Sequence, residues 1–142
     1  MVAAFAYGDS AMLEQYVPGT EVAVSVVDLG DGPVAWPAVE IQPRSGIYDY
    51  AARYTAGETE FFVPARISAA QADECARTAA MAHETLGLRD WSRVDFMVTD
   101  EGVYFLEANV APGMTETSLF PQAAVAAGFT LGKVAAALVA RH

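Results

Sequence analysis

The chain has 142 residues, of which 54% are hydrophobic, and this length and composition suit one compact domain with a buried core. Eight Lys and Arg against 18 Asp and Glu give a net charge of −10, which argues against electrostatic binding to nucleic acid or to an anionic membrane. The single cysteine excludes an internal disulfide, no secretory signal opens the chain, and no apolar stretch reaches the roughly 20 residues that cross a bilayer, so we expect a cytoplasmic protein without a membrane span.

The first third of the chain has apolar and β-branched runs separated by turn residues, a pattern typical of short strands. The breaks fall at Val17-Pro18-Gly19 and Asp31-Gly32-Pro33, and Pro37 indicates an edge position or a bulge for the strand that contains it. The next segment has no clear period, and long loops in compact domains often carry function. Strands are therefore predicted over residues 11–16, 21–29 and 34–41, followed by a long ordered loop over residues 43–57.

The second half opens with the clearest helix of the sequence. Ser68 and Gln71 form a capping-box pattern, and apolar residues then follow helical spacing up to Gly87, which ends the helix. Strands over residues 91–98 and 103–108, joined as a hairpin, and helices over residues 119–127 and 131–140 complete an α+β fold in which helices flank a mostly antiparallel sheet.

The predicted hairpin carries two carboxylates and an amide on adjacent strands. Period-two alternation defines one face of each strand, with Arg93, Asp95 and Met97 on the first and Phe105, Glu107 and Asn109 on the second. A register that makes Asp95 and Glu107 neighbours gathers the oxygen ligands that Mg²⁺ prefers, and two such ions could bridge nucleotide phosphates. The alternative is a solvated strand face in which Arg93 is paired with one of the carboxylates.

A tight Pro-Gly loop follows this hairpin and leads to a helix start, where backbone N–H groups could hold an anion. The whole stretch closely resembles the signature of the D-alanine:D-alanine ligase family of the ATP-grasp superfamily. The motifs that carry the resemblance are Arg93-Val94-Asp95-Phe96-Met97, Leu106-Glu107-Ala108-Asn109 and Pro112-Gly113-Met114-Thr115. It extends to Gly46-Ile47-Tyr48-Asp49-Tyr50 with Arg53-Tyr54, and to Leu13-Glu14-Gln15-Tyr16-Val17 with Gly19 and Glu21.

The family uses ATP to phosphorylate one D-alanine, and the amine of a second D-alanine then displaces phosphate to form a dipeptide for peptidoglycan precursors. The resemblance implies that Asp95, Glu107 and Asn109 ligate two Mg²⁺, with Mn²⁺ as an alternative ion. It also implies that Arg93 and the backbone N–H of Gly113 stabilise the negative oxygen that develops during the reaction. The alternative role for Arg93 is a structural ion pair.

Further roles follow from the same resemblance. Ser118 and Leu119 match the residues that hold the carboxylate of the second D-alanine, and the alternative for Ser118 is a simple helix N-cap. Glu14 and the backbone at Val17 match the adenine edge, and Glu21 matches the residue that binds the ribose hydroxyls. Side chains that would sandwich the adenine ring, or equally pack as ordinary core residues, are Met97, Leu106 and Ile47.

The loop over residues 43–57 carries Tyr48, Arg53 and Tyr54, and in the family it closes over the site and excludes water. Arg53 stands where the family usually has Lys, and Tyr54 resembles the dipeptide-forming members, which favours D-alanine as the second substrate. Two pairs depart from the common pattern, Val110-Ala111 in place of Thr-Ser and Glu116-Thr117 in place of Ser-His. His83 is interpreted as a surface or packing residue rather than a catalyst, Cys75 as an inert buried thiol, and Trp36 and Trp91 as core packing residues.

The resemblance implies that residues 1–142 are the C-terminal part of an ATP-grasp domain, without the N-terminal D-alanine-binding domain and the central lobe of a whole ligase. We therefore expect a portion that is inactive alone and that self-associates through apolar surface which the missing lobes would cover. The alternatives are a non-catalytic nucleotide-binding or interaction module derived from the ATP-grasp fold, and a ligase that joins a different amino or hydroxy acid.

Overall fold

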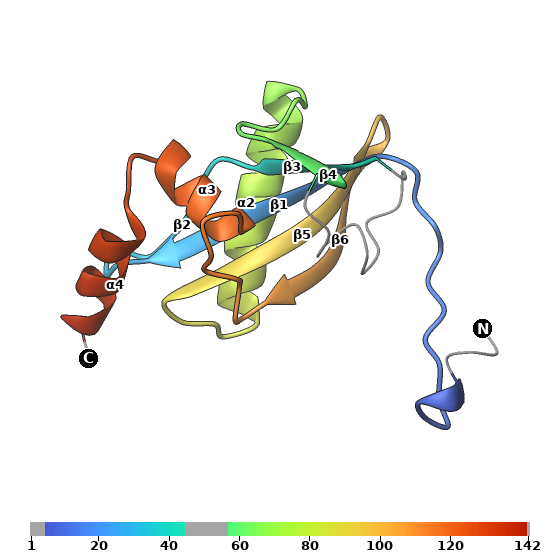
Figure 1. The fold of residues 1–142 in the computed structure, drawn as a ribbon, viewed down its shortest axis with the longest axis horizontal. Coiled ribbons are helices and arrows are strands. Elements are labelled where there is room, and N and C mark those ends of the chain that lie inside the picture. Colours follow the sequence, from blue (N-terminus) through green and yellow to red (C-terminus); the bar gives the residue numbers. More distant parts are fainter. Residues whose placement is uncertain (1–4, 45–56, 142) are drawn as a thin grey trace.

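The computed structural model describes residues 5–44 and 57–141, and its centre is one antiparallel sheet (Figure 1). The strands follow the order β4-β3-β1-β5-β6, and β2 pairs with the far end of β1. The strands are β1 (Thr20–Asp28), β2 (Pro33–Ala35), β3 (Val39–Pro43), β4 (Thr59–Phe62), β5 (Trp91–Thr99) and β6 (Gly102–Asn109). The helices are α2 (Ala69–Thr85), α3 (Leu119–Ala126) and α4 (Leu131–Val139). The predicted α+β architecture is thus confirmed.

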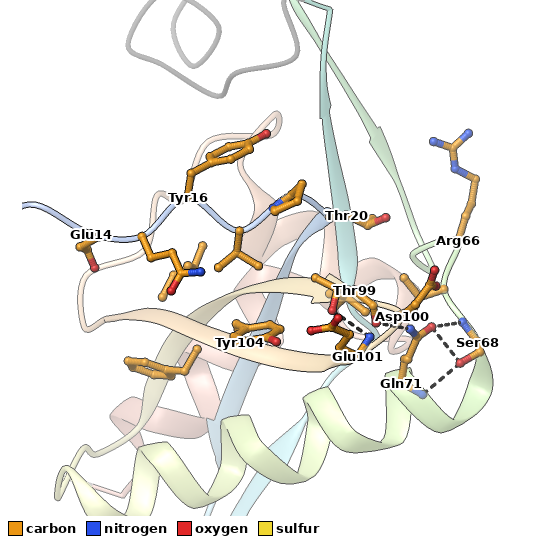
Figure 2. A pocket seen from close by; sticks show the side chains of 18 residues that line it. Glu14, Tyr16, Thr20, Arg66, Ser68, Gln71, Thr99, Asp100, Glu101 and Tyr104 are labelled. Carbon is orange, nitrogen blue, oxygen red and sulfur yellow. Dashed lines mark hydrogen bonds between the residues drawn. The ribbon is translucent and has the colours of Figure 1, made fainter.

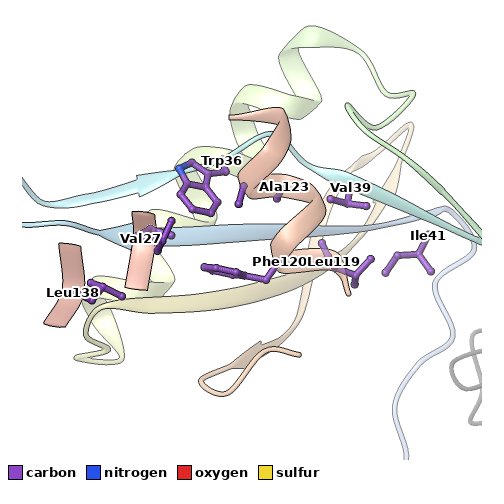
Figure 3. Close-up of a cluster of buried hydrophobic side chains, with 11 residues drawn as sticks. Val27, Trp36, Val39, Ile41, Leu119, Phe120, Ala123 and Leu138 are labelled. Atoms are coloured by element: carbon purple, nitrogen blue, oxygen red, sulfur yellow. The ribbon is translucent and has the colours of Figure 1, made fainter. Parts of the chain in front are cut away.

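Helices cover both faces of the sheet, and each face has its own core. On one face α2 packs Cys75 and Ala79 against alternate valines of β1 and β5 and against Phe96. On the other face α3 and α4 bury Phe120 and Leu138 over the intervening residues of β1 and over β3 (Figure 3). Because β1 is buried on both faces, its sequence is a nearly continuous apolar run rather than a strict alternation.

The second core is built around aromatic rings. The indole of Trp36 lies 5.3 Å from the ring of Phe120 and stacks at 5.4 Å on Phe129, while Trp91 meets Phe120 edge to face at 5.6 Å. Such offset and edge-to-face pairs add to the free energy of burial. These contacts confirm that both tryptophans are packing residues. They anchor α3, which follows the Pro-Gly loop in the sequence, against the sheet.

The helix α2 begins as the sequence predicts. The hydroxyl of Ser68 accepts from the backbone N–H of Gln71, and the side chain of Gln71 accepts from the backbone N–H of Ser68, so the capping box is complete. The helix ends at Thr85 with Leu86 as its C-cap, and Gly87 follows with a φ of 63°, a left-handed conformation that glycine adopts without strain. Within the described residues, no single helix is long and apolar enough to cross a membrane; α3 and α4 pass a length and composition test only together, and they are bent by 94°.

In the first half of the chain, two strand predictions differ from the structure and one strand was missed. Residues 11–16 are not a strand, because an apolar run forms a strand only where another strand pairs with it, and here the segment is extended and exposed. The strand predicted over residues 34–41 is two strands, since Pro37 lacks the N–H that a continuous ladder requires. The strand β4 was not predicted, because four residues are too few to establish a period. The predicted loop lies largely outside the described residues.

Candidate functional site

The hairpin of β5 and β6 brings the predicted metal ligands together. In its register Asp95 lies opposite Glu107, and Arg93 lies opposite Asn109, so all four side chains share one face. Ala23 of β1 lies opposite Asp95 on the other side, which places this group on the face that α3 partly covers. The side chain of Glu107 is 61% exposed, so the group opens to solvent at the edge strand.

Arg93 binds the buried carboxylate of Asp95 with two hydrogen bonds. Its Nε–H donates to Oδ1 at 2.8 Å and its Nη2–H donates to Oδ2 at 2.7 Å, while the side chains are only 10% and 7% exposed. The same Nη2 lies 3.9 Å from an oxygen of Glu107. The alternative role predicted for Arg93, an ion pair with a neighbouring carboxylate, is therefore present, and it fixes the guanidinium plane between the two acids.

A β-bulge divides the hairpin next to this group. The register shifts between Asp95 and Phe96, so that Phe105 lies opposite Phe96, with ring centroids 6.2 Å apart in an edge-to-face pair. The prediction that Phe105 shares the face of Glu107 was therefore wrong, because the extra residue, Leu106, reverses the alternation. No feature of the sequence marks this bulge. It turns Leu106 away from the regular ladder towards a neighbouring cavity.

The oxygen donors of this face fit a hard cation. Two opposed carboxylates and an amide match Mg²⁺, which usually takes one or two carboxylates together with phosphate oxygens. The amide oxygen of Asn109 accepts from the backbone N–H of Ala111 at 2.9 Å, and this bond orients the side chain. In the described part of the chain, no group of three or more His, Cys, Asp or Glu side chains is placed to hold a metal.

The Pro-Gly loop connects this face with the start of α3. A Cβ built on Gly113 would lie 2.8 Å from the hydroxyl oxygen of Ser118, so a side chain at this position would displace that hydroxyl. Ser118 occupies the N-cap position of α3, yet its hydroxyl makes no capping bond. It accepts instead from the backbone N–H of Thr115 at 3.2 Å. Leu119, the next residue, has its side chain in the core under α3.

A cavity of about 1020 Å³ lies at the tip of the hairpin. The extended segment 14–20 bounds it on one side, and the turn of the hairpin with the N-terminus of α2 bounds it on the other (Figure 2). Three of the predicted nucleotide residues, Glu14, Val17 and Leu106, line it. Glu21 and Met97 do not; they are register partners on β1 and β5. Ile47, Tyr48, Arg53 and Tyr54 lie outside the described residues.

Polar residues on the far side of this cavity were not predicted from the sequence. Ser68 and Gln71 reach it from the helix start, and Gln71 also donates to the backbone carbonyl of Thr99 at 3.0 Å. Gly19 lies so close to β5 that a Cβ there would be 2.4 Å from the carbonyl oxygen of Val98. This close approach gives a reason for the glycine, which the sequence pattern indicated only as a break.

Arg66 also lines the cavity and connects it to β3. Its backbone N–H and its Nε–H both donate to Oε2 of Glu40, and its Nη2–H donates to Oε1 at 2.5 Å. Nη2 also reaches Gln42 at 2.7 Å, and the guanidinium lies 3.4 Å from the ring centroid of Phe62. Hydrogen bonds from Arg66 lower the pKa of Glu40 against the opposing effect of burial.

Comparison with known proteins identifies the family of this chain. The model of the family described as D-ala D-ala ligase C-terminus matches residues 1–140. The D-alanine–D-alanine ligase of Pelotomaculum thermopropionicum is 44% identical over 126 residues, which cover 88% of this chain and 39% of that protein. The ligase of the same name from Syntrophotalea carbinolica is 40% identical over 137 residues, covering 96% and 44%.

Solved structures of the same group share the fold. The VanG D-Ala:D-Ser ligase of Enterococcus faecalis superposes with a TM-score of 0.75 at 29% identity, covering 89% of this chain and 37% of that one. The D-alanine–D-alanine ligase of Bacillus anthracis, in a complex with ATP, gives a TM-score of 0.70 at 25% identity and covers 89% and 38%. The chain spans about two fifths of the length of these relatives. The extent of the family match and the identity to these relatives establish that the chain belongs to the D-alanine–D-alanine ligase family, of which it corresponds to the C-terminal portion.

Proposed function

We propose that this chain supplies the metal, oxyanion and acceptor residues of a ligase that uses ATP to join two D-alanines through an acyl phosphate, for peptidoglycan precursors. The observation that carries the proposal is the register of β5 and β6, which makes Asp95 and Glu107 opposed neighbours with Arg93 between them. Two carboxylates compensated by one guanidinium suit a site that receives a metal-bound triphosphate.

Asp95, Glu107 and Asn109 would hold Mg²⁺, or Mn²⁺ in its place. When bound, such ions neutralise the charge of the nucleotide phosphates and polarise the phosphorus–oxygen bonds. The exposed carboxylate of Glu107 is open to an ion that arrives with the nucleotide. The pairing of Asp95 with Arg93 keeps the first carboxylate in a single orientation for that ion.

Arg93 and the N–H of Gly113 would stabilise the negative oxygen of the acyl phosphate and of the tetrahedral species that the second D-alanine forms. Arg93 suits this role because its guanidinium keeps its charge at every working pH and its plane is fixed by Asp95. Ser118 and the backbone of Leu119 would hold the carboxylate of the second D-alanine. Tyr48, Arg53 and Tyr54 would exclude water from the acyl phosphate.

The adenine would occupy the cavity at the tip of the hairpin, with its edge read by Glu14 and the backbone of Val17. Leu106 lines this cavity and would contact one face of the ring. The resemblance also assigns Met97 and Ile47 to the ring, but Met97 does not line the cavity and Ile47 lies outside the described residues. Glu21, opposite Met97 in the sheet, would bind the ribose hydroxyls. The cavity, about 1020 Å³, is large enough to hold a nucleotide.

The chain alone would be inactive, because its relatives are more than twice as long and the remaining part would bind the first D-alanine and the phosphates. In isolation it would self-associate through exposed apolar residues of its N-terminal segment. A cytoplasmic location is part of the same proposal, since ATP and the D-alanine substrates of such a ligase are cytoplasmic metabolites.

The test uses a chimeric ligase, in which this chain follows the part of the Pelotomaculum thermopropionicum ligase that precedes the matching region. Phosphate release is measured with ATP, Mg²⁺ and D-alanine. We expect release that requires D-alanine, and its loss in the Asp95→Asn and Glu107→Gln variants. Glu84→Gln is the matched control, since this exposed acid lies at the end of α2 and does not line the cavity. A folded chimera that binds ATP but releases no phosphate would favour a non-catalytic nucleotide-binding module. Dipeptide formation by the isolated chain would contradict the proposed dependence on the missing lobes.

A further inference from the structure

Three hydroxyl groups lie together in the loop before α3. The hydroxyl oxygens of Thr115 and Ser118 are 2.8 Å apart, and the hydroxyl oxygen of Thr117 lies 3.4 Å from that of Thr115. The backbone N–H of Thr115 also donates to the hydroxyl of Ser118. Ser118 would otherwise cap its own helix, but its hydroxyl is turned towards Thr115 instead.

A serine hydroxyl has one proton to donate and two lone pairs that accept. The N–H of Thr115 takes one lone pair of Ser118. When the hydroxyl of Thr115 donates as well, both lone pairs of Ser118 are filled, and its own proton is directed outward. A hydroxyl that accepts two bonds is polarised and donates more strongly. Ser118 is then a donor only, which favours an anionic partner over a cation or a donor group.

We propose that Thr115 is a positioning residue, which commits the hydroxyl of Ser118 to donate to the carboxylate of the acceptor amino acid. This inference rests on the proposed function, since it needs an acceptor carboxylate at Ser118. Thr115 acts through Ser118 and does not itself touch the acceptor.

Gly113 supports the same arrangement from the other side. A Cβ at Gly113 would lie 2.8 Å from the hydroxyl oxygen of Ser118 and 3.4 Å from its Cβ, so the glycine leaves Ser118 the space in which it meets Thr115. The N–H proposed to stabilise the oxyanion and the hydroxyl proposed to hold the acceptor are therefore parts of one compact loop. This loop couples the position of the acceptor carboxylate to the position of the reacting carbonyl.

The test uses the chimeric ligase of the preceding section and the variant Thr115→Val, which keeps the shape and the backbone N–H of residue 115 and removes its hydroxyl. We expect the KM for the acceptor D-alanine to rise about tenfold, the effect of weakening one hydrogen bond to a charged group, with little change in kcat or in the KM for ATP. Thr115→Ser should restore the KM. Thr117→Val is the matched control and should leave it unchanged.

A double-mutant cycle separates positioning from a merely structural role. In the Ser118→Ala background, Thr115→Val should have no further effect on the acceptor KM, because the hydroxyl on which Thr115 acts is gone. An equal rise in both backgrounds, or an unchanged KM in an active Thr115→Val enzyme, would overturn the inference while leaving the proposed function intact. A chimera without ligase activity would instead contradict the proposed function itself.

Discussion

Arg93 compensates a carboxylate that has little access to water, since the side chain of Asp95 is buried and both of its oxygens accept from one guanidinium. Removing one partner of such a pair leaves a buried charge without compensation, which costs more than the pair contributes. We expect Arg93→Met to lower the free energy of unfolding of the chain by about 3 kcal/mol in urea denaturation.

The double variant Arg93→Met with Asp95→Asn is the control for this prediction. It removes both charges, so it should recover a large part of the lost stability. Equal losses in the single and the double variant would mean that packing of the Arg93 stem, and not charge compensation, accounts for the effect.

His83 is another buried polar residue with a defined partner, because its Nδ1 lies 2.8 Å from the hydroxyl of Ser92. The imidazole is 2% exposed, and burial lowers its pKa below the ordinary 6.5, although Asp28, Glu84 and Asp90 act in the opposite direction. The unfolded chain therefore binds this proton more readily than the folded one. The contribution of His83 to the free energy of unfolding is fully present well above pH 6.5. It is lost as the pH falls from there towards the lower pKa of the folded state.

We expect the free energy of unfolding to decrease as the pH falls below about 6.5, measured by urea denaturation at each pH. In His83→Gln, which keeps a hydrogen-bonding group but cannot titrate, this decrease should be absent. Glu40 does not interfere, because its pKa is lowered from 4.5 and its contribution is lost only at more acidic pH. A pH dependence that persists in His83→Gln would assign the effect to another group.

At the scale of elements, Arg66 ties the segment before α2 to both strands of the β3–β4 hairpin through Glu40, Gln42 and Phe62. The loop with Tyr48, Arg53 and Tyr54 connects the same two strands in the sequence. Among the described strands β4 lies at the edge of the sheet and pairs with β3 alone, so the contact of Arg66 with Phe62 is a second tie that holds it. We expect Arg66→Ala to speed hydrogen exchange of the β4 amides while leaving the amides of β5 unchanged.

Arg44→Ala is the matched control for that experiment. Arg44 also reaches across the hairpin, to Glu60 at 3.7 Å, but both side chains are mostly exposed and such surface pairs contribute little. Arg66→Lys should protect β4 only in part, because an ammonium cannot make the bidentate contact. Equal exchange in the Arg44→Ala and Arg66→Ala variants would mean that Arg66 does not hold the hairpin.

The elements that the sequence predicts well are those whose signals are local. The capping box at Ser68 defines the start of α2, and the alternation around Asp95 defines β5. The bulge at Leu106, the short strand β4 and the unpaired segment over residues 11–16 depend on which other segments lie alongside, and no local pattern contains that information.

The candidate site divides in the same way. The motif identifies Arg93 and the proposed metal ligands, and strand alternation with the right register accounts for their grouping. The hydrogen bonds among Thr115, Ser118 and Gly113 depend on how the loop folds back on α3, and residue types alone do not specify this. The polar end of the cavity comes from α2, which is distant in sequence from the hairpin.

At the scale of the whole molecule, neither of the two helical layers described above covers the N-terminal segment. Figure 1 shows this segment running away from the sheet, and Tyr7, Met12, Leu13 and Tyr16 are 77% to 94% exposed on it. Apolar side chains gathered on one extended segment are more than the scattered exposure that a monomer usually has. They are the part of the surface through which the isolated chain is expected to self-associate.

The last prediction concerns this segment. The isolated chain should give a mass in light scattering that increases with protein concentration, because association buries apolar side chains that are exposed in the monomer. Replacing both Met12 and Leu13 by Glu should shift the protein towards the monomer, since each copy would then bring two charges into the contact. Val125→Glu with Val139→Glu is the matched control: these valines are 72% and 76% exposed on α3 and α4, away from the segment, and the change in net charge is the same. If both double variants dissociate equally, general charge repulsion and not the segment controls association. A wild-type chain that remains monomeric at high concentration would contradict the prediction directly.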